Sequence, residues 1–103
     1  MLCNVTITSY DAGLTVEVFT DTQQTTLSVW LCTGWAGHAW YAYWTDANDV
    51  GEPDYRQFGP YTTPSVAYND ARNALGYTQL LPDWEAAKRA CNRPGGYSFE
   101  KEA

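Results

Sequence analysis

The stretch that most constrains the fold is residues 38–45, His-Ala-Trp-Tyr-Ala-Tyr-Trp-Thr, in which four of eight residues are large aromatics. Such density is typical of a β-strand, because aromatic rings pack well on a pleated surface. The spacing also lacks the period of about 3.6 residues that an amphipathic helix requires. Side chains alternate along a strand, so Trp40 and Trp44 share one face, and Tyr41 and Tyr43 share the other. This strand is therefore either covered on both faces or presents an aromatic row to something outside the chain.

Three earlier segments alternate apolar and polar residues in the same way, and turn signals separate them. They are residues 3–8, 14–19 and 26–32, with turns at 11–13 and 21–24. Alternation with period two predicts half-buried strands, and short polar connections between such strands predict hairpins. We therefore expect an antiparallel sheet in which residues 38–45 form the fourth strand.

Two short helices are predicted after the strands. Thr63 is suited to cap a helix that has Pro64 in its first position, and Gly76 is a natural stop for it. A second helix is expected to open at Pro82, with acids in its first turn and cations near its end, the order that the helix dipole favours. Trp84 falls on the apolar face of this helix and is expected to anchor it in the core.

The sequence thus predicts one α+β domain over residues 1–103: an antiparallel sheet of four to five strands followed by two short helices packed on one face. The fifth strand would be residues 55–58, ended by Gly59-Pro60. Residues 97–99 are expected to dock back, and the chain from Glu100 onward to fray. The second face of the sheet would stay open unless a dimer or another partner covers it.

The charge is strongly uneven. The net charge is −6, and residues 1–55 contain no Lys or Arg at all. An excess of negative charge argues against binding to the phosphates of nucleic acids, which requires Lys and Arg, and against binding to an anionic membrane surface. Neither a membrane-spanning apolar run nor a signal peptide is apparent. We therefore expect no direct nucleic-acid binding, no membrane association and a soluble, cytoplasmic protein.

No metal or cofactor is expected. Cys3, Cys32 and Cys91 form no CxxC pair and are best explained as small buried hydrophobes. A contact between Cys3 and Cys32 on neighbouring strands would be compatible with metal or redox chemistry, but one His and three dispersed Cys rarely form a site. Residues 46–51 resemble the start of a calcium loop, yet Gln57 stands where the bidentate Glu belongs. An acidic hairpin loop is the better interpretation.

The sequence does not indicate an enzyme. His38 is the only histidine, and no nucleophile motif accompanies it. The acids offer many pairs for glycosidase chemistry, but nothing selects two of them. A single sheet with two short helices is also not expected to leave a deep cleft.

The aromatic side chains are the strongest functional signal. Part of the set must form the core, and the remainder is suited to a binding patch, because Trp and Tyr dominate interface hot spots. A platform for single-stranded nucleic acid would need a basic groove beside it. The set comprises Trp30, Trp35, Trp40, Tyr41, Tyr43, Trp44, Tyr55, Phe58 and Tyr61.

Residues 41–75 resemble a hairpin-to-helix pattern of small phage and prophage proteins. The pattern is Tyr-x-Tyr-Trp, an acidic loop, Phe-Gly-Pro-Tyr-x-Thr at residues 58–63, and an alanine-rich helix. Small acidic phage proteins of this kind include inhibitors of bacterial defence, anti-CRISPR proteins among them. The resemblance implies an inhibitor in the host cytoplasm that blocks a basic, nucleic-acid-binding surface of a defence complex, such as a CRISPR effector.

We therefore predict a non-enzymatic binding protein in which clustered acids meet cations and nearby aromatics form the desolvated centre. The alternatives are a viral structural or assembly protein that uses an open aromatic face, as a homodimer would, and a small hydrolase or carbohydrate-binding module that uses Trp35 and Trp40. The predicted partner-binding residues are Asp46, Asp49, Glu52, Asp54, Trp35, Trp40, Trp44 and Tyr55.

Overall fold

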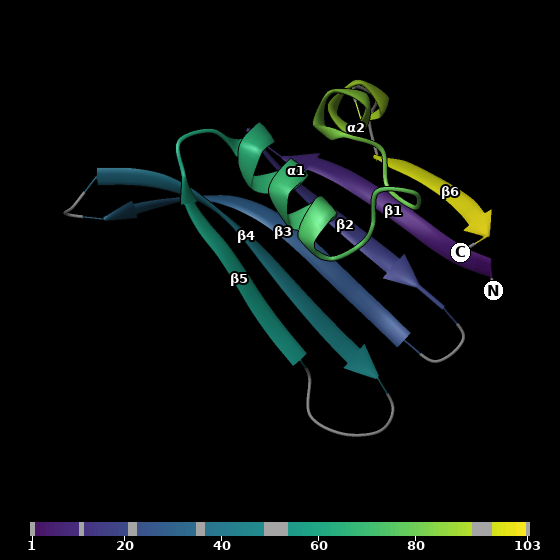
Figure 1. Cartoon of the computed structure of the whole chain (residues 1–103). Coiled ribbons are helices and arrows are strands. Elements are labelled where there is room, and N and C mark those ends of the chain that lie inside the picture. Colours follow the sequence, from purple (N-terminus) through teal and green to yellow (C-terminus); the bar gives the residue numbers. More distant parts are fainter. Residues whose placement is uncertain are drawn as a thin grey trace.

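Alternating strands build one antiparallel sheet, and two helices lie against one of its faces (Figure 1). The structure is a computed structural model and describes residues 2–10, 12–20, 23–34, 37–48, 54–91 and 96–102. Its elements are, in chain order, β1 (Leu2–Tyr10), β2 (Gly13–Phe19), β3 (Gln23–Gly34), β4 (Gly37–Asn48), β5 (Asp54–Tyr61), α1 (Pro64–Ala74), α2 (Trp84–Ala90) and β6 (Tyr97–Glu102).

The predicted count of four to five strands is wrong, because the sheet has six strands in the order β5-β4-β3-β2-β1-β6. The sixth strand is the C-terminal segment, which pairs antiparallel with β1 as far as Glu102, opposite Leu2. This pairing places Phe99 opposite Val5 and against the core. Burial of Phe99 and the free outer edge of β1 give the segment both an apolar anchor and backbone partners, so it does not fray after Glu100.

The fifth strand is also longer than predicted. It runs from Asp54 to Tyr61, and Gly59-Pro60 lies within it. The pairing of β4 with β5 shifts register between Trp40 and Ala42. Pro60 has no backbone N–H to donate to a neighbouring strand. The register shift and the position of β5 at the edge of the sheet together allow the strand to continue through this proline.

The core lies between the helices and one face of the sheet. Cross-strand register stacks Val5 on Val18 and Val16 on Leu27, and Ala42 lies opposite Val29. The helices close this layer with buried residues, which are Ala67, Tyr68 and Ala71 of α1 and Trp84 and Ala87 of α2. The α+β class is therefore shown, with the apolar side of every central strand turned toward the helices.

Each helix begins after a capping side chain. Thr63 is the cap that the sequence predicts for α1, whereas α2 begins at Trp84, two residues after the predicted Pro82, and Asp83 is its cap. The Thr63 hydroxyl accepts a hydrogen bond from the Val66 amide, 3.4 Å away, and Asp83 Oδ1 accepts one from the Ala86 amide at 2.9 Å. Trp84 is 8% exposed, as its predicted core position requires. Among the described residues, no helix is long and apolar enough to cross a membrane.

Candidate functional site

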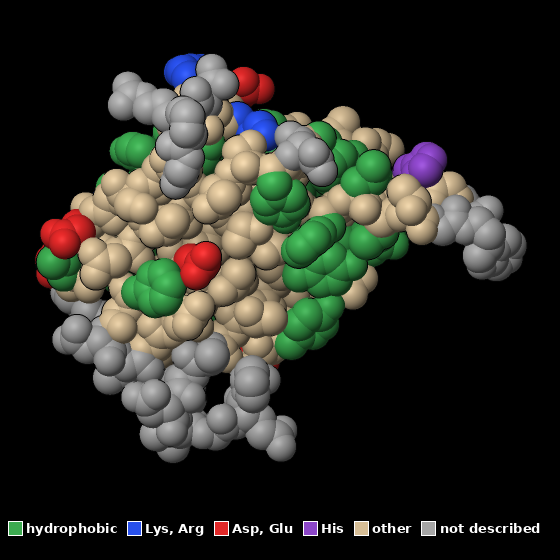
Figure 2. Space-filling model, turned by 180° about the vertical axis from the view of Figure 1, so that it is seen from behind, with side chains coloured by type: hydrophobic (Ala, Val, Ile, Leu, Met, Phe, Trp, Pro, Cys, Tyr) green, Lys and Arg blue, Asp and Glu red, His purple; other side chains and the backbone are tan. Residues whose placement is uncertain are grey.

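The sheet face opposite α1 and α2 is the most prominent feature that the fold leaves uncovered by any described helix (Figure 1). Seen from behind, this face is largely polar, and its hydrophobic side chains gather toward one side (Figure 2). Strand alternation places hydroxyl groups on it, including a Thr6–Ser98 pair with oxygens 3.0 Å apart. We call it the open face.

Five aromatic side chains on the open face form a chain of neighbouring rings, which we call the aromatic row: Tyr10, Trp30, Tyr41, Tyr43 and Tyr55. The ring centroids of Tyr10 and Trp30 lie 5.4 Å apart, and Trp30 sits directly opposite Tyr41 in the β3–β4 register. The Tyr41–Tyr43 and Tyr43–Tyr55 centroids are 6.1 and 6.2 Å apart. These spacings are those of favourable aromatic pairs, so the row extends over β1, β3, β4 and β5 as one surface.

The rings are held in place yet accessible. Tyr10 donates its hydroxyl to the Val29 carbonyl at 3.3 Å. The residue opposite it is Gly13, where an added Cβ would lie 2.5 Å from the Val29 oxygen and 3.1 Å from the Tyr10 ring. Only glycine therefore leaves room for this ring. Trp30 is nevertheless 48% exposed and Tyr55 54% exposed.

Tyr43, which lies between Tyr41 and Tyr55 in the row, is fixed from its hydroxyl end. Its oxygen lies 3.3 Å from the Cys32 sulfur, within hydrogen-bond distance. This hydrogen bond, followed by burial, raises the pKa of Tyr43 from 10.0 to about 12. Burial likewise raises the pKa of Tyr10. Both phenols are therefore neutral at physiological pH, and the row is an apolar surface with hydrogen-bonding tips.

The charge of the open face is negative. Glu17 of β2 lies opposite Thr6 and Thr26, and so belongs to this face. β1 to β4 contribute no Lys or Arg, because residues 1–55 contain none. Arg56 lies on the other face, opposite Trp44 and with its guanidinium carbon 5.3 Å from the Phe58 centroid. The open face thus combines exposed rings with carboxylates.

The aromatic residues predicted to bind a partner are divided between the two faces. Tyr55 belongs to the aromatic row, whereas Trp40 and Trp44 lie on the helix-covered face and pack against the core. The indole nitrogen of Trp44 donates to the Tyr77 hydroxyl at 3.3 Å. Trp35 lies outside the described residues.

The predicted acidic cluster is described in part. Asp46 and Asp54 face each other directly across β4 and β5. Gln23 donates to Asp46 Oδ2 at 3.2 Å, while Asp46 Oδ1 is buried without a hydrogen-bond partner in the described part of the chain. Asp49 and Glu52 lie outside the described residues. The described pair belongs to the helix side of the sheet, at its β4–β5 end.

Sequence reasoning missed Tyr10 and did not assign Trp30 to the binding surface. The signal that would have found Trp30 is hairpin register, since it faces Tyr41 across a two-residue connection between Gly34 and Gly37.

The suggested Cys3–Cys32 contact is wrong: β2 lies between their strands, and Cys3 is in the core while Cys32 joins Tyr43. Within the described ranges, no three metal-ligating side chains gather.

Comparisons of the chain with protein-family models, with curated proteins and with solved structures found no match.

Proposed function

We propose that this chain is a non-enzymatic binding protein that uses its open face to engage a basic surface on another protein. The observation that carries the proposal is the aromatic row on an acidic sheet face. In the form that the phage resemblance implies, the target is a nucleic-acid-binding surface of a bacterial defence complex, with a CRISPR effector as one candidate.

The row has the physical properties of an interface centre. Three pairs of its rings already pack together, Tyr10–Trp30, Tyr41–Tyr43 and Tyr43–Tyr55, so docking a partner immobilises few side chains and costs little conformational entropy. Exposed Trp and Tyr are the residues most enriched among hot spots, where truncation costs about 2 kcal/mol or more. The Trp30 and Tyr55 rings are the most exposed members of the row, and they are the expected anchors.

The acidic residues would add selectivity for a cationic partner. Glu17 lies on the open face, whereas Asp46 and Asp54 lie on the helix side, at the β4–β5 end of the sheet. Complementary charge mainly raises the association rate and lowers affinity for wrong partners. Changing Glu17 to Gln should therefore slow association and flatten its dependence on salt.

Differential capture from bacterial lysate tests the proposal. The baits are the unchanged protein, a Trp30→Ser/Tyr55→Ser variant, and a Val66→Ser control. Val66 is an apolar residue of α1 that is 43% exposed, on the helix side of the sheet. A basic protein that is retained by the unchanged bait and the control, but lost from the open-face variant, supports the proposal. The proposal is contradicted if all three baits capture the same proteins. It is also contradicted if the only protein lost from the open-face variant is acidic.

A viral assembly protein is the second candidate, and the position of β5 favours it. This eight-residue strand lies at the edge of the sheet, and most of its residues are exposed. An unpaired edge is a template for adding a strand from another copy. Light scattering separates the candidates, because self-assembly gives a size that grows with concentration and an inhibitor does not.

A further inference from the structure

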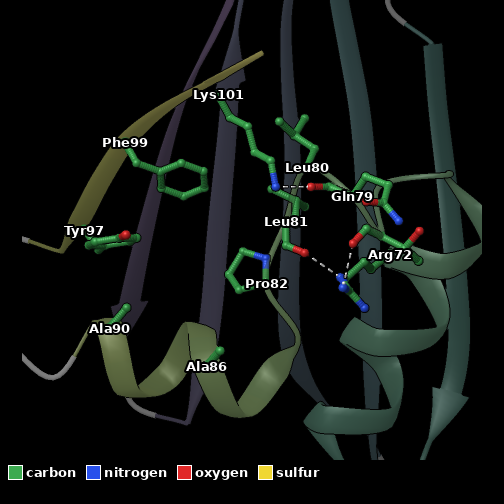
Figure 3. Close-up of a pocket in the computed structure, with 11 residues that line it drawn as sticks. Arg72, Gln79, Leu80, Leu81, Pro82, Ala86, Ala90, Tyr97, Phe99 and Lys101 are labelled. Atoms are coloured by element: carbon green, nitrogen blue, oxygen red, sulfur yellow. Dashed lines mark hydrogen bonds between the residues drawn. The ribbon is translucent and has the colours of Figure 1, made fainter. Parts of the chain in front are cut away.

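A hollow of about 530 Å³ lies on the helix side of the sheet, between the segment after α1, helix α2 and strand β6 (Figure 3). Its apolar wall comes from three parts of the chain. Leu81 and Pro82 precede α2, Ala86 and Ala90 belong to α2, and Tyr97 and Phe99 face the hollow from β6. The Tyr97 and Phe99 centroids are 5.3 Å apart. The volume lies within the usual range of small-molecule sites, about 300–1,000 Å³.

Two cations border this hollow. Arg72 donates from Nε to the Leu81 carbonyl at 2.8 Å and from Nη2 to the Thr78 carbonyl at 2.9 Å. Lys101 reaches the same segment from β6 and donates to the Gln79 carbonyl (Figure 3). These hydrogen bonds hold both head groups at the pocket. Each head group keeps further N–H donors for a ligand, because a guanidinium carries five N–H groups and an ammonium carries three.

The charge of this site is opposite to that of the protein. The chain carries a net charge of −6, yet Arg72 and Lys101 line the pocket and no described Asp or Glu does. Cations whose only described partners in the pocket are neutral carbonyls favour a ligand that brings a negative charge. The aromatic and aliphatic wall favours an apolar body attached to that charge.

We propose that this pocket binds a small apolar carboxylate, with the carboxylate at Lys101 and the apolar body against Tyr97 and Phe99. The site is independent of the open face, because it lies on the helix side of the sheet. It gives the protein a small-molecule ligand in addition to a protein partner.

Paired probes test the charge and the apolar body separately. Isothermal titration compares 2-naphthoate with 2-naphthylmethanol, which has the same ring system and no charge. We expect the carboxylate to bind at least about tenfold more tightly, the difference that one charge-assisted hydrogen bond provides. Equal affinity for the two probes, or no binding of 2-naphthoate at millimolar concentration, would overturn the proposal.

Variants of the folded protein locate the site. Lys101→Met should weaken 2-naphthoate about tenfold and Lys101→Arg should restore it. Arg89→Met is the matched control, because Arg89 is an exposed cation of α2 outside the lining. Ala90→Phe should fill the hollow and abolish binding. If Lys101→Met does not fold, Ala90→Phe and the probe pair still decide. The site is refuted if Arg89→Met weakens the affinity for 2-naphthoate as much as Lys101→Met does. It is also refuted if Ala90→Phe leaves that affinity unchanged, because the probe then binds elsewhere.

Discussion

Trp84→Ala is the substitution whose effect on stability follows most directly from the structure. The side chain is 8% exposed, and its ring lies 5.7 Å from that of buried Tyr68. The same residue starts α2, and its amide donates to Asn69 Oδ1 at 3.1 Å. The indole therefore connects α2 to α1, and no other large aromatic lies on α2.

The expected loss follows from the area that this ring buries. A buried aromatic side chain removes about 150–250 Å² from water, which at about 25 cal/mol per Å² corresponds to roughly 4–6 kcal/mol. Truncations of buried Trp to Ala cost about 3–5 kcal/mol, since the site relaxes in part. In a domain of this size each kcal/mol lowers the melting temperature by about 4–8 °C.

Urea denaturation followed by circular dichroism measures this loss. Val66→Ala is the control, since Val66 is exposed on α1 and its truncation should change the free energy of unfolding by less than about 0.5 kcal/mol. A loss below about 1 kcal/mol for Trp84→Ala would mean that α2 does not dock through this residue.

Three further predictions concern single residues. Asp46→Asn should raise the free energy of unfolding by up to about 1 kcal/mol in urea melts, because it removes the like charge directly opposite Asp54; a loss would contradict this. Gly59→Ala should lower the melting temperature, since φ is +137° and the new Cβ would lie 2.7 Å from the Tyr41 ring; an unchanged melt would contradict it. The raised pKa of Tyr43 predicts a stability contribution that is complete below pH 10 and lost as pH rises from 10.0 to about 12, because the unfolded chain releases this proton first. Tyr43→Phe should therefore flatten the fall of the urea midpoint over that range, and an unchanged fall would contradict the shift.

Local signals in the sequence were sufficient for the central strands and for the start of the first helix. Val16 and Leu27 alternate with polar residues, and Thr63 precedes a proline, so pattern and cap chemistry alone place these elements. The sixth strand was not predictable in this way. Residues 97–102 are mostly polar. They form a strand because they pair with the outer edge of β1, where Phe99 lies opposite Val5. That information resides in tertiary contacts rather than in local spacing.

The candidate site shows the same limit. Alternation separates Trp40 from Tyr41, but it does not say which of the two faces the helices cover. Only the assembled sheet decides that Trp40 joins the core while Tyr41 joins the aromatic row. Tyr10 was missed because its contact with Trp30 is made across β2.

The central claim is that the open face, rather than the helix side, contacts the partner. Hydroxyl-radical footprinting of side chains, with and without the captured basic protein, tests it most directly. We predict that oxidation of Trp30 and Tyr55 slows severalfold in the complex, while oxidation of Val66 and Tyr97, which are exposed on the helix side, stays unchanged. Protection of Val66 or Tyr97 with Trp30 and Tyr55 unchanged would contradict the claim.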